Sequence, residues 1–222
     1  MAVRGARALA APDAVLDPGF YERPADVVAP ALLGKLLVVR DEAAGGFRAG
    51  RVVETEAYVG QDDLACHASK GLTSRTATLF GPGGHAYVYL IYGMYDMFNV
   101  VCQPAGVPHA VLVRAVEPLV PGASAPGLEG LPLLPPAAGG RGDGPGRLTR
   151  ALGIGRGHDA EALWGPRLYV LDGPPPAAVA VTPRVGVAYS GPWADAPLRY
   201  LDPHSRHVSR PSPSQLGSGR RR

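Results

Sequence analysis

Cross-linking and membrane-anchoring features are scarce in this chain. Its 222 residues include two cysteines, Cys66 and Cys102, which are too few for a disulfide framework or a four-cysteine zinc site. We interpret both as buried thiols of a protein in a reducing compartment. No hydrophobic run approaches the length of a membrane-spanning helix, and the Ala-rich first residues lack the apolar core of a secretory signal. We therefore predict a cytoplasmic protein without membrane contact.

The signatures of common nucleotide, metal and hydrolase sites are also missing. The motifs G-x-G-x-x-G, G-x-x-x-x-G-K-[ST], H-E-x-x-H and G-x-S-x-G do not occur in the sequence. His67, His85 and His109 are too scattered to predict a metal site. We therefore expect neither a metal nor an organic cofactor.

Arginine supplies almost all of the positive charge. The formal net charge is +3 and the isoelectric point is about 9.0, which permits a polyanion as the partner without requiring one. The 30 glycines and 24 prolines gather in segments that mark boundaries. We expect a disordered tail over 1–17, a folded domain over 18–204 and a disordered basic tail over 205–222. Within the domain, the low-complexity Pro/Gly stretch 118–146 is predicted to be a flexible loop.

Hydrophobic periodicity predicts short helices and strands around this loop. Helical spacing begins after Pro24, and a second short helix is expected over 147–154. Apolar runs bounded by turn residues indicate strands. These runs cover 36–40, 47–59, 109–116, 168–171, 178–187 with an interruption at Pro183, and 197–201.

The stretch His85–Cys102, H-A-Y-V-Y-L-I-Y-G-M-Y-D-M-F-N-V-V-C, predicts a β-hairpin. Aromatic and β-branched residues fill two runs, and Gly93 breaks them in the middle. Hairpin turns normally carry small polar residues, whereas this one would present Tyr92 and Met94. An exposed apolar tip predicts a partner into which it can insert.

The strand over 47–59 carries two acidic residues in an apolar run. Alternation places Glu54, Glu56 and Tyr58 on one face, and buried carboxylates are costly unless they have partners. From the strand pattern alone, a solvent-facing edge with ordinary surface glutamates is the preferred interpretation. Arg114, inside the run H-A-V-L-V-R-A-V, needs a carboxylate or other oxygen partner. Glu54 or Glu56 are the obvious candidates, and a purely structural ion pair is the alternative.

Together these residue types suit the recognition of a flipped nucleotide. An apolar tip can fill the gap that an extruded nucleotide leaves in a base stack. Aromatic faces can then sandwich the base, which is worth about 1–3 kcal/mol per stacked base. A carboxylate can deprotonate a water for attack on the sugar carbon. Aromatic hairpins that merely pack a core have the same spacing, so the residues alone leave both interpretations open.

A series of motifs resembles the alkyladenine (3-methyladenine) DNA glycosylase family. In order they are R-V-V-E-T-E-A-Y-V-G, D-D-L-A-C-H, F-G-P-G-G-H-A-Y-V-Y-L-I-Y-G-M-Y, N-V-V, V-L-V-R-A-V-E-P-L, G-P-G-R-L-T-R-A-L-G-I and P-R-V-G-V, between Tyr21 and Tyr200. The resemblance implies that Glu56 activates the attacking water. It implies that Arg114 and a main-chain carbonyl near Val185 help to hold this water.

The same resemblance assigns the base pocket. Tyr58 and His67 would lie on one face of the flipped base and Tyr89 on the other, with Tyr87 supporting this wall. Asn99 would crowd the position of the 2-amino group of guanine.

The resemblance also assigns the contacts to DNA. Tyr92 would intercalate and Met94 would flank it. The basic residues expected at the DNA backbone are Arg75 and Arg147, the latter beside a helix N-terminus that could hold a phosphate.

We therefore predict a single α/β (α+β) domain, with a curved, mainly antiparallel sheet flanked by short helices and a protruding DNA-intercalating hairpin. Its expected function is that of a monofunctional DNA glycosylase for alkylated or deaminated purines in double-stranded DNA, acting as a monomer. Neither lysine of the chain, Lys35 or Lys70, matches a catalytic position, so no strand-cleaving activity is expected. The alternatives are a non-catalytic DNA- or RNA-binding module that uses the same hairpin, and a small-molecule hydrolase or transferase, which would leave the apolar tip unexplained.

Overall fold

Eight strands form one sheet in the computed structural model, which describes residues 14–137 and 139–210. The path runs β3-β4-β5-β2-β1-β6, with β8 paired to both β2 and β7, and all of these pairings are antiparallel. The strands are β1 (Leu36–Asp41), β2 (Gly46–Val59), β3 (Ala86–Ile91), β4 (Tyr95–Cys102), β5 (His109–Pro118), β6 (Leu168–Leu171), β7 (Ala180–Thr182) and β8 (Arg199–Leu201). The α-helices are α1 (Ala25–Ala31) and α2 (Pro145–Leu152), and 3₁₀ helices cover Pro18–Phe20, His67–Lys70, Ala77–Phe80, Arg156–His158 and Ala188–Ala194. The predicted α/β domain with a curved antiparallel sheet is confirmed.

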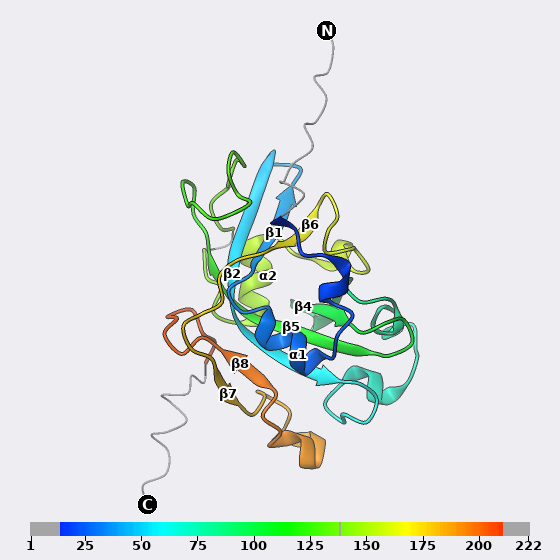
Figure 1. The fold of residues 1–222 in the computed structure, drawn as a ribbon. Coiled ribbons are helices and arrows are strands. Elements are labelled where there is room, and N and C mark those ends of the chain that lie inside the picture. Colours follow the sequence, from blue (N-terminus) through cyan, green and yellow to red (C-terminus); the bar gives the residue numbers. More distant parts are fainter. Residues whose placement is uncertain (1–13, 138, 211–222) are drawn as a thin grey trace, which may run out of the picture.

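Strand β2 is the longest strand and lies at the centre of the sheet. One edge pairs with β5, whereas the other edge is shared by β1, which pairs with residues 46–51, and β8, which pairs with residues 54–56. Figure 1 shows β2 bending through the molecule, with β7 and β8 beside its second half. Residues 54–56 therefore have a strand on each side.

An irregularity between β2 and β5 changes which side chains face the main core. The pairing skips Val53 on β2 and Arg114 on β5. The core residues on either side of this point are Val52 and Ala57 on β2, and Val116 and Val113 on β5. Because the positions differ by an odd number on each strand, the alternation of inward and outward side chains shifts by one residue on both strands. Such bulges re-aim side chains and are common beside active sites.

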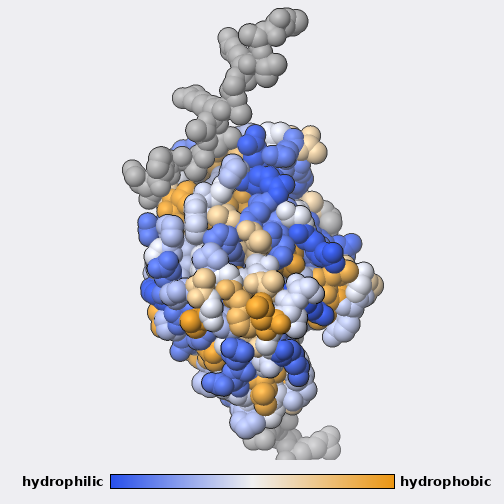
Figure 2. Space-filling model, turned by 90° about the vertical axis from the view of Figure 1, so that its right-hand side faces the viewer, coloured by the Kyte–Doolittle hydropathy of each residue, from blue (hydrophilic) through white to orange (hydrophobic). Residues whose placement is uncertain are grey.

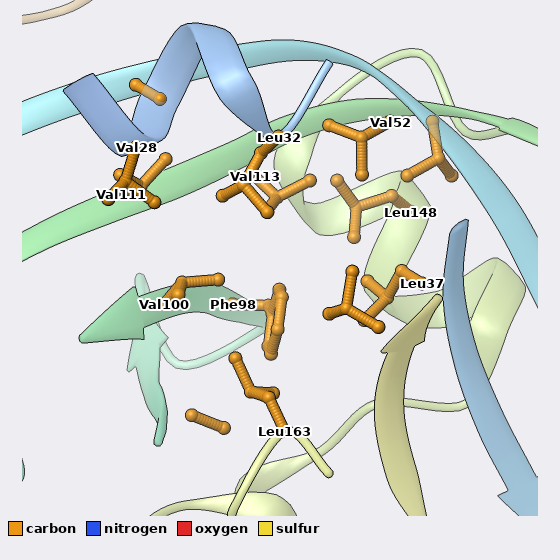
Figure 3. Packing of buried hydrophobic residues seen from close by; sticks show 14 of the residues in the cluster. Val28, Leu32, Leu37, Val52, Phe98, Val100, Val111, Val113, Leu148 and Leu163 are labelled. Atoms are coloured by element: carbon orange, nitrogen blue, oxygen red, sulfur yellow. The ribbon is translucent and has the colours of Figure 1, made fainter. Parts of the chain in front are cut away.

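The main hydrophobic core lies against one face of the sheet. Helix α1 contributes Val28 and Leu32, α2 contributes Leu148, and β4 contributes Phe98. Figure 3 shows the α1 side chains beside those of β5, and Phe98 lying between β4 and Leu163. Burial of these side chains fixes the two helices to the curved sheet.

Alternation on β3 and β4 sends their other side chains to the opposite face. On β3, Ala86 and Val88 belong to the main core, whereas Tyr87 and Tyr89 pack in a separate cluster. Asn99 of β4 follows a core residue and likewise turns away from the core. The sheet thus separates the core from a face that carries aromatic and polar side chains.

Parts of the predicted loop and tails pack against the domain. Ala125 and Leu128, inside the Pro/Gly stretch, are buried in a second cluster with residues of β1, β2 and β6. The amide of Leu16 donates to the carbonyl of Val170 at 2.9 Å, and Ser209 is only 3% exposed. Packing therefore extends beyond both limits of the predicted domain. Residues 1–13 and 211–222 of the predicted tails, and residue 138 of the loop, lie outside the described residues.

Exposed apolar side chains are scattered over the surface. Figure 2 shows a face on which hydrophobic residues form small groups among hydrophilic ones. The most exposed large hydrophobic side chains within 14–137 and 139–210 are Tyr92 and Tyr189. In the same part of the chain, each helix is too short or too polar to cross a bilayer.

A matched pair of leucine substitutions tests the assignment of the core. Leu148→Ala should lower the free energy of unfolding by about 2–5 kcal/mol, because it removes buried methyl groups and leaves a cavity. Leu72→Ala, at a side chain that is 67% exposed, should change it by less than about 0.5 kcal/mol. Urea denaturation followed by circular dichroism measures both. Equal effects of the two substitutions would contradict the packing of α2 against the sheet.

Candidate active site

A pocket of about 270 Å³ lies on the face of the sheet that carries the aromatic side chains. This volume is near the lower end of the range for small-molecule sites, about 300–1,000 Å³. The predicted site residues that line it are Tyr58, His67, Tyr87, Tyr89, Tyr92, Asn99, Arg114 and Val185. The fold therefore brings most of the predicted site residues to one cavity.

Glu56 lies directly behind the pocket wall and its side chain is fully buried. Its Oε2 accepts a hydrogen bond from the Tyr58 hydroxyl at 2.9 Å, and its Oε1 accepts one from the Val185 amide at 2.7 Å. A carboxylate offers about four lone-pair positions, so Oε2 retains the capacity to bind a water. The contact of Val185 is made by its amide, whereas the sequence resemblance implies a role for a carbonyl there.

Arg114 lies between the two carboxylates of β2. Its Nε donates to Glu54 Oε1 at 2.8 Å, and its Nη1 lies 3.4 Å from Glu56 Oε1. Burial opposes the charge of this guanidinium, but attraction from Glu56 and Glu54 outweighs the burial and raises the pKa of Arg114. The predicted partnership is confirmed. The interpretation of Glu54 and Glu56 as surface glutamates is wrong, because β5 and β8 flank β2 at these residues.

His67, Tyr87 and Tyr89 form an aromatic wall. The ring centroids of His67 and Tyr89 are 4.5 Å apart, those of Tyr87 and Tyr89 are 5.2 Å apart, and His67 Nδ1 hydrogen-bonds the Tyr87 hydroxyl at 3.0 Å. The expectation that His67 lies with Tyr58, across the base from Tyr89, is therefore wrong. Burial, followed by the charge of Arg75, lowers the pKa of His67, so its ring is neutral at pH 7.

Tyr58 has a charged neighbour as well as the carboxylate of Glu56. The guanidinium carbon of Arg184 lies 4.7 Å from the centroid of the Tyr58 ring, within the range of a cation–π contact. Burial, together with the negative charge of Glu56, raises the pKa of the Tyr58 hydroxyl well above its usual value. The phenol therefore stays protonated and can donate to Glu56.

Arg184 belongs to a buried ion pair that we did not predict from the sequence. It binds Asp63 through two hydrogen bonds of 2.5 and 2.9 Å, and both side chains are fully buried. Asp63 also accepts a hydrogen bond from the amide of Val59 at 3.2 Å. Because Arg184 precedes Val185, the pair ties the Val185 segment to the end of β2. The only sequence signal was that both residues fall inside the conspicuous motifs D-D-L-A-C-H and P-R-V-G-V.

Asn99 is nearly fully buried at the inner side of the pocket. Its Nδ2 donates to the carbonyl of Tyr87 at 3.1 Å and makes a longer contact of 3.5 Å with the carbonyl of Met97. These main-chain acceptors on the two strands of the hairpin fix the orientation of the amide. The side chain is therefore a rigid part of the pocket wall.

The hairpin tip presents its apolar side chains to solvent. Tyr92 is 82% exposed and Met94 is 67% exposed. The Met94 amide donates to the Ile91 carbonyl, and the two central residues of this turn, Tyr92 and Gly93, have φ values of 52° and 66°. Positive φ at both positions normally selects Asn-Gly, and an aromatic residue in this region is strained. Such strain is typical of functional positions.

The arginines expected at the DNA backbone both have protein neighbours. The guanidinium carbon of Arg75 lies 5.6 Å from the centroid of the Tyr89 ring. Arg147, in the first turn of α2, donates from Nη1 to Asp143 Oδ2 at 3.1 Å. Exposed ion pairs of this kind contribute about 0.2–1 kcal/mol, so Arg147 can exchange its carboxylate for a phosphate.

The pocket offers little to a metal ion. Within residues 14–137 and 139–210, no group of three or more His, Cys, Asp or Glu side chains is arranged to bind one. Cys66 lines the pocket, but burial raises the pKa of its thiol to about 11, so the thiol stays protonated. Cys66 and Cys102 are both free and buried.

Comparison with known proteins identifies the family. The family model described as methylpurine-DNA glycosylase (MPG) matches residues 19–206. A protein of Myxococcus xanthus is 53% identical over 200 residues, covering 89% of this chain and 95% of its own length. A protein of Methanocella arvoryzae is 45% identical over 206 residues (91% and 99%), and one of Legionella pneumophila is 43% identical over 193 residues (86% and 96%). All three are provisionally named 3-methyladenine DNA glycosylases.

The matched region contains the aromatic pocket, both carboxylates of β2, Arg114 and the hairpin. The likeness therefore covers the whole candidate site. The chain belongs to the methylpurine-DNA glycosylase family, and is thus a hydrolase that acts on alkylated purines in DNA repair.

Proposed function

We propose that this protein removes 3-methyladenine and 7-methylguanine from double-stranded DNA by hydrolysing the N-glycosidic bond with a water activated by Glu56. One observation carries the proposal: Glu56 contacts Arg114 and the Val185 amide, two groups whose residues line an aromatic pocket. A binding module has no need of this arrangement. The names of the relatives support the choice of substrate.

In the proposed reaction, a water bound at Glu56 attacks C1′ of the sugar while the base departs. Glu56 takes the proton of the water as general base. Arg114, held by Glu54, keeps its Nη1 toward Glu56 and the water. The Tyr58 hydroxyl and the Val185 amide fix the orientation of the carboxylate.

The flipped base would stack between Tyr58 and the wall that contains His67 and Tyr89. Stacking is worth about 1–3 kcal/mol per base and does not depend on base identity. Discrimination against the 2-amino group, which would slow release of 7-methylguanine relative to 3-methyladenine, would then come from Asn99, because its amide is fixed by main-chain hydrogen bonds and cannot move aside easily.

The exposed hairpin tip would occupy the gap in the duplex. Tyr92 would enter the base stack with Met94 beside it, while Arg75 and Arg147 bind the flanking phosphates. The tip and the pocket are adjacent in one chain, because Tyr92 also lines the pocket. A monomer is therefore sufficient for flipping and hydrolysis.

The enzyme would be monofunctional, without strand cleavage. Lys35 Nζ is bound to Asp172 at 2.5 Å, and neither Lys35 nor Lys70 lines the pocket. Cleavage through a Schiff base requires an amine at the sugar carbon.

Substitution of Glu56 tests the mechanism. Glu56→Gln keeps the size of the side chain but removes the base, so the single-turnover rate constant for release of 3-methyladenine should fall by about 10²–10⁴-fold. Affinity for damaged duplex, measured by fluorescence anisotropy, should be retained. Glu117→Gln, at an exposed residue of β5, is the matched control and should leave the rate unchanged.

The same samples, analysed without alkali or heat, should contain intact strands. Prompt strand scission by the wild-type protein would refute the monofunctional assignment. Binding by the wild-type protein without base release would instead favour a recognition module.

Comparison of leaving groups tests the substrate class. Release of 3-methyladenine should be faster than release of hypoxanthine at pH 7, because the cationic base departs as a neutral molecule whereas hypoxanthine must be protonated. The lowered pKa of His67 leaves its ring neutral at this pH, so it is a weak proton donor to a leaving base. Single-turnover rates on two otherwise identical duplexes measure the difference. Equal rates would contradict the assignment of cationic purines as preferred substrates.

Substitution of Asn99 tests discrimination at the 2-amino group. Asn99→Ala should raise release of 7-methylguanine relative to 3-methyladenine, by about 10–200-fold for the removal of one crowding group. Asn99→Leu, which keeps a comparable bulk, should leave the ratio near that of the wild-type protein. The ratio of the two single-turnover rates is the readout. An unchanged ratio in Asn99→Ala would remove Asn99 from the selection of substrate.

A further inference from the structure

Glu54 is surrounded by hydrogen-bond donors although its side chain is fully buried. Its Oε1 accepts from Arg114 Nε at 2.8 Å, Arg199 Nε at 2.7 Å and the Ser209 hydroxyl at 2.8 Å. Its Oε2 accepts from the Ser209 amide at 2.6 Å. Two of these four hydrogen bonds therefore come from one residue, which follows β8 by eight positions in a segment without regular structure.

Ser209 also contacts the catalytic arginine directly. Its Oγ accepts a hydrogen bond from Arg114 Nη2 at 3.2 Å while the same hydroxyl donates to Glu54. The guanidinium of Arg114 is thus held at Nε by Glu54 and at Nη2 by Ser209. Its remaining nitrogen, Nη1, faces Glu56 at 3.4 Å. Because the guanidinium is planar and rigid, fixing two of its nitrogens determines the direction of the third.

We propose that Ser209 is a positioning residue of the glycosylase, which aims Arg114 at Glu56 through its hydroxyl. The inference rests on the proposed function, since it assumes that Glu56 and Arg114 hold the attacking water. Ser209 lies three residues beyond the region 19–206 that matches the family model. It is 3% exposed, so its contacts form inside the protein.

The physical basis is the sharing of Arg114 between two carboxylates. Without the Ser209 hydroxyl, Glu54 loses one donor and Arg114 loses one acceptor in a region closed to water. Both can compensate if the guanidinium moves toward Glu54, which lengthens its distance to Glu56. A displacement of the order of 1 Å in a group that holds a reactant can reduce a rate by about 10²-fold.

The test compares variants of the full chain at Ser209. Ser209→Ala retains the backbone amide that binds Glu54 and removes the hydroxyl that binds Arg114. We expect the single-turnover rate constant for 3-methyladenine release to fall by about 10–10²-fold, with unchanged affinity for damaged duplex. Ser209→Thr keeps the hydroxyl and should restore most of the rate. Ser205→Ala is the matched control: the Ser205 hydroxyl lies in the same segment and accepts a hydrogen bond from the nearby His207 amide, so this variant should behave as the wild-type protein.

Thermal unfolding of each variant separates positioning from stability. A Ser209→Ala protein that is folded at the assay temperature, binds DNA normally and releases base slowly supports the proposal. Normal release by the folded variant, or equal losses in Ser209→Ala and Ser209→Thr, would overturn it. If Ser209→Ala does not fold, Ser209→Cys preserves the volume with a weaker donor, and a folded Ser209→Cys protein with the wild-type rate would overturn the proposal as well.

The proposed function can fail independently of this inference. In that case the wild-type protein itself releases no base. An active wild-type protein whose rate depends on Glu56 but not on Ser209 would retain the proposed function and remove only the positioning role.

Discussion

Two carboxylates buried in the central strand are the constraint on which the rest of the site depends. Removing Glu54 and Glu56 from water is costly, and the protein offsets this cost only by supplying charges and donors at short distance. Arg114 comes from β5, Arg199 comes from β8 and Ser209 comes from the segment that follows β8. Elements more than a hundred residues apart in the chain are therefore held at one point of β2. The two positive and two negative charges therefore balance within this cluster.

The irregularity at Val53 and Arg114 explains how a site of this polarity can lie beside a well-packed core. Both strands shift their alternation at the same level of the sheet. Val52 and Val116 on one side of the irregularity, and Ala57 and Val113 on the other side, therefore all face the core. The residues between them in the alternation, including Glu56, turn to the other face. A regular ladder would keep one parity along the whole of β2 and would direct either the carboxylates or the core residues to the wrong side.

The sequence predicted local features of the site better than the contacts between distant segments. The hairpin, the shared face of Glu54 and Glu56, and the pairing with Arg114 follow from alternation and from the cost of burying charge. The interpretation of a solvent-facing edge was wrong because β8 covers this edge, and the predicted strand over 197–201 gives no indication that its partner is β2. The position of His67 and the Asp63–Arg184 pair depend on how loops fold back onto the sheet. The hydrophobic periodicity of the sequence does not predict how loops fold. Ser209 lies in a stretch whose composition is typical of a tail, and its composition does not indicate the hydrogen bonds that its amide and hydroxyl donate to Glu54.

The balance of charge in this cluster has a consequence for the proposed release of a cationic base. In the proposed reaction, positive charge would leave the purine and develop on the sugar as 3-methyladenine departs, so the charge would move toward Glu56 rather than appear anew. A protonated histidine in the pocket would repel the cationic base before the reaction begins. Two carboxylates without positive partners would instead bind the cationic base so tightly that the movement of positive charge to the sugar would not be favoured. The neutral ring of His67 and the pairing of Glu54 with two arginines avoid both situations. In this proposal Glu56, which shares the guanidinium of Arg114 with Glu54, would be the carboxylate that interacts more strongly with the transition state than with the bound base.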